Sequence, residues 1–142
     1  MSHKPLLQLN QFPHRTYDKI RYGDTDRQGH VNNVVFSEFL ETGRLEIVYN
    51  PNKPLYKAGC QFVIVQNNLS LIKEIYWPGQ VDIGTGITKI GSSSITFYQQ
   101  LFQNGEVVAS AETVIVQVDD ITHKSSSLTE ETIQVLSQYL FK

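Results

Sequence analysis

The feature that most constrains the fold is one long amphipathic helix, predicted over residues 33–49. Asn32 or Asn33 is a suitable N-cap, and Asn50 followed by Pro51 ends the helix. Gly43 lies within the apolar face, where Ala would be more stable by ~1 kcal/mol, so we expect the helix to approach another backbone closely there. The apolar residues recur at spacings of three and four and form a single stripe: Phe36, Phe39, Leu40, Gly43, Ile47 and Val48.

Most of the remaining chain shows the alternation of β-strands. We expect strands over residues 16–22, 61–76, 81–90, 94–102 and 106–118, with Asn104-Gly105 as a hairpin turn. Residues 1–15 predict an irregular arm. The run from Ser127 to Glu130 predicts a capping box before a terminal amphipathic helix.

These elements predict a single α+β domain over residues 1–142. A meander of long antiparallel strands has one face to bury, and the long helix is the obvious cover. One helix covers only part of a wide sheet, so we expect a sheet edge to pair with a second subunit.

Composition narrows the function classes. The 142 residues include 12 Lys and Arg against 14 Asp and Glu, and the net charge of −2 argues against non-specific nucleic-acid binding. Cys60 is the one cysteine, so no intrachain disulfide is expected. The sequence shows neither a secretory leader nor a run of about 18 apolar residues, which predicts a cytoplasmic protein that does not enter a membrane.

The densest polar cluster, residues 24–33, lies between the first predicted strand and the long helix. A helix N-terminus presents unpaired N–H groups and partial positive charge, so it can polarise a carbonyl. A carboxylate just upstream, Asp24 or Asp26, could attack that carbonyl or activate water against it. The structural alternative is that both aspartates are turn or cap residues and that His30 is a hydrogen-bonded structural histidine.

The same cluster does not match a metal or nucleotide motif. Asp24, Asp26 and Gly29 resemble the start of a calcium-binding EF-hand loop, but Val35 stands where the bidentate Glu must be. The sequence has no zinc spacing, glycine-rich nucleotide fingerprint or serine nucleophile elbow. We therefore expect neither a metal nor a cofactor.

The run DTDRQGHVNN, followed by VVFSEFLETGR, resembles the opening signature of the hotdog-fold acyl-CoA thioesterases, nearest the 4-hydroxybenzoyl-CoA thioesterase-like group. Later segments occur in the same order at residues 77–79, 90–94 and 116–119, the last followed by residues 122–125, and the resemblance covers roughly residues 16–140. It implies a hotdog fold, in which an antiparallel sheet of five to six strands wraps around the long helix. It also implies a homodimer or homotetramer with active sites between subunits.

The resemblance also implies roles for individual residues. Asp26 corresponds to the catalytic carboxylate, as nucleophile or general base, and the backbone N–H near Asn33 would polarise the thioester carbonyl. His30 completes the expected catalytic set. Glu41 is expected to be structural and to pair with Arg44. The expected substrate-binding residues are Gly29, Val31, Asn32, Phe36, Ser93, Lys89 and Lys124; the two lysines would meet CoA phosphates, and Phe36 would line the acyl pocket or the core.

The predicted function is hydrolysis of an acyl-CoA to a free carboxylic acid and CoA. The alternative is a non-catalytic or acyl-carrier-protein-linked hotdog protein that binds acyl thioesters. Hydration of an enoyl thioester is a third possibility, but the usual placement of its histidine and acid is not found. The sequence does not specify the acyl group.

Overall fold

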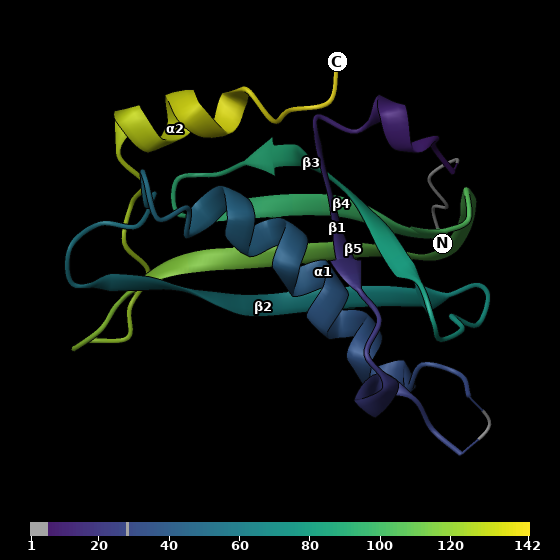
Figure 1. Cartoon of the computed structure of the whole chain (residues 1–142). Helices are drawn as coiled ribbons and strands as arrows, with labels where there is room; N and C mark the ends of the chain where they lie inside the picture. Colours follow the sequence, from purple (N-terminus) through teal and green to yellow (C-terminus); the bar gives the residue numbers. More distant parts are fainter. Residues whose placement is uncertain (1–5, 28) are drawn as a thin grey trace.

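The computed structural model describes residues 6–27 and 29–142, which form one five-stranded sheet and two α-helices (Figure 1). Helix α1 crosses one face of the sheet, as the hotdog fold requires. None of the described helices has the length and apolar character needed to cross a membrane. The elements are β1 (His14–Lys19), α1 (Asn33–Val48), β2 (Cys60–Leu71), β3 (Gln80–Ile90), β4 (Ser94–Gln103), β5 (Glu106–Asp119) and α2 (Glu130–Ser137), with 3-10 turns at Leu9–Gln11 and Tyr22–Asp24.

The strand order is β1-β3-β4-β5-β2, and all neighbouring strands are antiparallel. Asn104 and Gly105 both have positive φ and form the predicted hairpin turn between β4 and β5. At one edge, β3 extends beyond β1, and its Ile87 exchanges backbone hydrogen bonds with Tyr139 and Phe141. Strand β2 forms the other edge, where its only strand partner in the described sheet is β5.

The predicted apolar stripe of α1 is buried against the sheet, which confirms the helix and its orientation. Gly43 does mark a close approach. A Cβ at this position would lie 2.5 Å from Thr85 Oγ1 and 2.9 Å from Ile83 Cγ2. The expectation of an adjacent backbone was wrong, because the groups that fill this space are side chains of β3 and β4.

A buried polar group lies beside Gly43, between α1 and the sheet. Arg44 is only 6% exposed and donates to Gln99 Oε1 at 3.1 Å. Gln99 Nε2 in turn donates to the Leu40 carbonyl and to Thr85 Oγ1, both at 2.9 Å. Burial lowers the pKa of Arg44, while the charge of Glu41 acts in the opposite direction. The predicted pair of Glu41 with Arg44 is thus present only as this charge interaction, and the side-chain hydrogen bond of Arg44 goes to Gln99.

Two boundaries at the chain's ends differ from the sequence predictions. Strand β1 begins at His14, and residues 9–11 form a 3-10 turn, so the irregular arm was wrong over these positions; residues 1–5 lie outside the described part. Helix α2 is capped by Thr129, whose hydroxyl accepts from the Thr132 amide at 3.1 Å, and not by Ser127. Thr129 stands immediately before the first helical residue, which is the position a cap requires.

Strand β2 ends at Leu71, earlier than predicted. The amides of Ile72 and Lys73 both donate to the Val108 carbonyl, at 2.9 and 3.0 Å. Two consecutive donors on one acceptor break the regular ladder and turn the chain away from β5. Residues 73–77 are consequently free to pair with the loop that precedes α1.

Candidate functional site

The two aspartates before α1 have opposite environments. Asp24 is 6% exposed, and its Oδ2 accepts from the Arg21 amide at 2.9 Å. Its carbonyl also accepts from the Asn32 amide at 2.9 Å, which ties the 3-10 turn to the start of α1. Asp26 is exposed. Asp24 is therefore held inside the fold, and Asp26 is the acid of this pair that meets solvent.

The loop that carries Asp26 closes on itself. The Asp26 amide donates to the His30 carbonyl at 2.8 Å, and Asp26 Oδ1 lies 3.3 Å from the His30 amide. Gly29 allows this turn because its φ of 81° lies in the left-handed region that other residues rarely adopt. These contacts hold the carboxylate of Asp26 on a short closed loop at the surface.

The first backbone amides of α1 lie next to this loop. Asn32 caps α1: its Oδ1 accepts from the Val34 amide at 3.1 Å, and its carbonyl accepts from the Val35 amide at 2.9 Å. The amide of Asn33, the first helical residue, has no acceptor among the described residues. This N–H sits at the positive end of the helix and can donate to a carbonyl oxygen.

His30 connects the loop to the segment that follows β2. Residues His30 and Tyr76 form an antiparallel bridge, and the Val31 amide donates to the Ile75 carbonyl at 2.7 Å. The imidazole Nδ1 lies 3.1 Å from Glu74 Oε1, and the ring contacts Tyr76 edge to face at 4.9 Å. Sequence reasoning missed Glu74 and Tyr76, because no motif marks this stretch between two strands.

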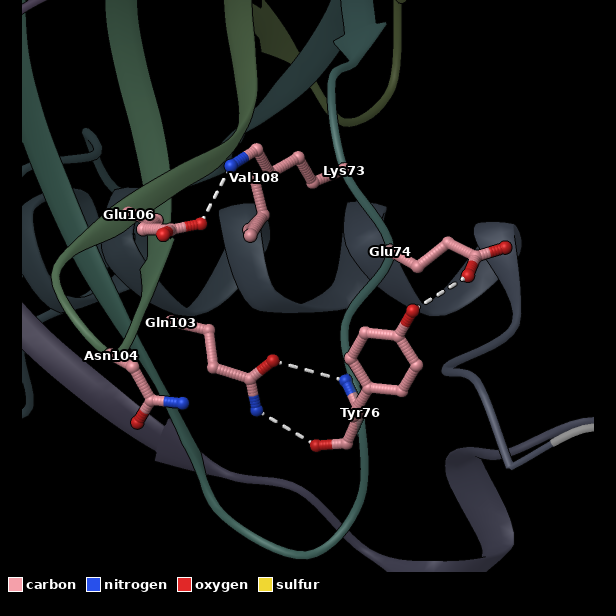
Figure 2. Close-up of a pocket in the computed structure, with 7 residues that line it drawn as sticks. All are labelled: Lys73, Glu74, Tyr76, Gln103, Asn104, Glu106 and Val108. Atoms are coloured by element: carbon pink, nitrogen blue, oxygen red, sulfur yellow. Dashed lines mark hydrogen bonds and ion pairs between the residues drawn. The ribbon is translucent and has the colours of Figure 1, made fainter.

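A hollow of about 380 Å³ borders the same segment (Figure 2). Figure 2 shows Gln103 bonded to both backbone groups of Tyr76, and the tyrosine hydroxyl bonded to Glu74. Among the described residues, no group of three His, Cys, Asp or Glu side chains is arranged to hold a metal ion. The lining residues are Lys73, Glu74, Tyr76, Gln103, Asn104, Glu106 and Val108.

The remaining predicted site residues lie in two other environments. Val31 and Phe36 are 3% and 1% exposed and belong to the core beneath the start of α1, so their substrate-binding role stays a prediction. Lys89, Ser93 and Lys124 lie at the opposite end of the sheet, where β3 and β5 end and α2 packs (Figure 1). Within one chain, therefore, these three residues are not brought together with Asp26.

Comparison with known proteins identifies the family. A family model described as "Thioesterase-like superfamily" matches residues 20–136. The chain belongs to the thioesterase-like superfamily. Among curated proteins it is similar to the uncharacterized protein YsmA of Bacillus subtilis (strain 168), at 26% identity over 119 residues, covering 82% of this chain and 80% of YsmA.

Two solved structures of thioesterases are also similar to this superfamily member. A predicted thioesterase from Bacillus stearothermophilus is 28% identical, with a TM-score of 0.81 over 90% of this chain and 96% of that one. A thioesterase from Thermus thermophilus, in complex with coenzyme A and zinc, is 26% identical, with a TM-score of 0.76 over 89% and 92%. These neighbours share the hotdog arrangement of sheet and helix.

Proposed function

We propose that this protein hydrolyses the thioester of an acyl-CoA to a carboxylic acid and free CoA, with Asp26 as the catalytic carboxylate. The observation that carries the proposal is that Asp26 is exposed on the loop leading into α1, whose first amide, that of Asn33, has no acceptor among the described residues. One group can attack or activate water, and the other can stabilise the negative charge that develops on the carbonyl oxygen. Membership of the thioesterase-like superfamily supports the reaction class.

Two routes use this geometry. As a nucleophile, Asp26 attacks the carbonyl carbon and forms a mixed anhydride; the thiolate of CoA leaves and takes a proton, and water then cleaves the anhydride to the free acid. As a general base, Asp26 removes a proton from water while the water oxygen attacks the carbonyl; the C–S bond then breaks, and the CoA thiolate leaves with the proton that Asp26 returns. In both routes the Asn33 N–H donates to the oxyanion.

The proposed substrate carrier is CoA, and the proposed active form is a homodimer paired through β2. This strand is an open edge, and its Ile64 and Val65 are 50% and 58% exposed. If two β2 strands pair in the antiparallel direction about a two-fold axis, the partner's sheet runs in the opposite direction along the shared edge. The end carrying the partner subunit's Lys89, Ser93 and Lys124 would then lie on the same side as Asp26 and could bind the CoA phosphates. The coenzyme A complex of the Thermus thermophilus thioesterase supports this substrate class.

The catalytic proposal is tested with Asp26→Asn. We expect thiol release from a panel of short, medium, long-chain and aromatic acyl-CoAs to fall by about 100-fold or more, because the amide is neither nucleophile nor base. Asp82→Asn is the matched control, since Asp82 accepts from Gln80 at 2.9 Å, outside the loop, and should retain full turnover. Hydrolysis by Asp26→Asn at the parent rate would refute the proposal.

The dimer is tested with Val65→Lys, which places a charge at the open edge. Sedimentation should show a dimer for the parent chain and a monomer for the variant, together with loss of turnover. A parent chain that sediments as a monomer while hydrolysing acyl-CoA would refute the shared site.

A further inference from the structure

We propose that Glu74 is a positioning residue that fixes the orientation and tautomer of the His30 imidazole beside the catalytic loop. This inference rests on the proposed function for its catalytic meaning, but its physical content is independent of any substrate. Glu74 lies outside every sequence motif of the chain. It reaches the site only because β2 ends early and residues 73–77 turn toward the loop.

Both oxygens of the Glu74 carboxylate are occupied. Oε1 lies 3.1 Å from His30 Nδ1, and Oε2 accepts from the Tyr76 hydroxyl at 3.1 Å. The hydrogen bond to Glu74 is the main cause that raises the pKa of Tyr76, so the phenol stays a neutral donor. The edge-to-face contact between the rings of His30 and Tyr76 closes this group of three side chains.

The segment that carries Glu74 is anchored to the sheet. Gln103, at the end of β4, accepts from the Tyr76 amide at 3.0 Å and donates to the Tyr76 carbonyl at 2.7 Å (Figure 2). Between Glu74 and Tyr76, Ile75 is fully buried in the core, and its carbonyl accepts a hydrogen bond from the Val31 amide. The position of Glu74 relative to His30 is therefore set by the sheet as well as by the loop itself.

This contact decides which imidazole nitrogen carries the hydrogen. A carboxylate oxygen at 3.1 Å repels a lone pair and attracts a hydrogen, so this ion-pair contact favours the neutral tautomer with the hydrogen on Nδ1, in which Nε2 is an acceptor. An Nε2 acceptor can orient a water molecule or take a proton during thioester cleavage, whereas the other tautomer would present a hydrogen there. Glu74 thus acts through His30 and has no contact with the reacting atoms in this proposal.

The test is the imidazole ¹⁵N spectrum of labelled protein at about pH 9, above the usual range of histidine titration, with His30 assigned from a His30→Gln variant. We expect the Nδ1–H form in the parent and a shift toward Nε2–H in Glu74→Ala. Glu74→Gln should retain the Nδ1–H form, since its amide oxygen still places partial negative charge beside Nδ1. Glu106→Gln makes the same change on the same hollow, away from His30, and should leave the spectrum unchanged.

The rate of acyl-CoA hydrolysis by the same variants is the second test. Glu74→Ala should lower kcat/KM for the most rapidly hydrolysed acyl-CoA by about tenfold, the low end of the loss that follows when the partner orienting a metal-bound histidine is removed. Glu74→Gln should restore most of the rate. The inference is overturned if parent His30 is in the Nε2–H form, or if Glu74→Ala keeps the Nδ1–H form. A protein that hydrolyses no thioester but shows the predicted tautomer change refutes the proposed function and leaves the positioning role standing.

Discussion

Polar groups lie at two places along α1, in its middle and at its N-terminus, and their burial and hydrogen bonding are opposite. In the middle of the helix, Arg44 and Gln99 are buried and bonded to one another and to the surrounding structure. At the N-terminus, Asp26 is exposed, and the Asn33 amide has no acceptor among the described residues. Arg44 and Gln99 thus form a buried polar layer between the middle of the helix and the sheet, whereas the polar groups at the helix start face solvent.

The contrast shows that polar residues stabilise the fold where they are buried and are available to bind a ligand where they are exposed. A buried polar group must be satisfied within the protein, because leaving it unpaired costs the full desolvation penalty. Among the described residues, no buried side-chain nitrogen or oxygen lacks a partner. Capacity for hydrogen bonding to a substrate is therefore found where the chain meets solvent, at the start of α1. Three substitutions test this difference between the buried middle of α1 and its exposed start.

The largest effect is expected for Gln99→Leu. The guanidinium of Arg44 would lose its buried acceptor, and the free energy of unfolding should fall by about 3 kcal/mol. Chemical denaturation measures this change. The double variant Arg44→Leu with Gln99→Leu should recover part of the loss, since no charge is left buried. A single variant as stable as the parent would mean that Arg44 finds another partner and that the layer is not closed.

An intermediate effect is expected for Gly43→Ala. Helix propensity alone would stabilise the protein by ~1 kcal/mol, but the added methyl group would meet Thr85 and Ile83. Overpacking should dominate and lower the free energy of unfolding by about 2 kcal/mol. Ser37→Ala, at an exposed position of the same helix, is the control and should be neutral or stabilising. If Gly43→Ala stabilises the protein, the layer is looser than its contacts indicate.

The smallest effect is expected at the open end of the helix. Asn32→Ala removes the side-chain cap on the Val34 amide and should cost about 1 kcal/mol in thermal or chemical denaturation. Asn32→Asp keeps an oxygen acceptor and should be close to the parent. Equal losses in both variants would indicate that Asn32 acts through another contact and not as a cap.

Much of the fold could be predicted because its signals are local. The spacing of Phe36 and its neighbours fixed the helix face, and Asn104-Gly105 fixed a hairpin. Gln99 also carried a usable signal: it is a polar residue on the apolar side of an alternating strand. That pattern indicates a buried polar partner, which proved to be Arg44.

The candidate site was only partly accessible to sequence reasoning. The Asp26 loop is contiguous, so its residues could be identified together. Glu74 could not be assigned to His30, because their contact depends on where β2 leaves its ladder with β5, a tertiary event with no local signal. The assignment of Lys89 and Lys124 depends on a second subunit, which lies beyond the reach of periodicity within one chain.

The buried layer between Arg44 and Gln99 also specifies how the sheet is assembled. Side chains alternate between the two faces of a strand, so sliding β4 by two residues would keep the same face toward the helix but put Phe97 or Leu101 in the place of Gln99. Apolar residues alone would tolerate several such alignments, but Arg44 has its acceptor in just one. The hydrogen bond between Arg44 and Gln99 therefore selects one register of β4 among several that bury similar apolar side chains.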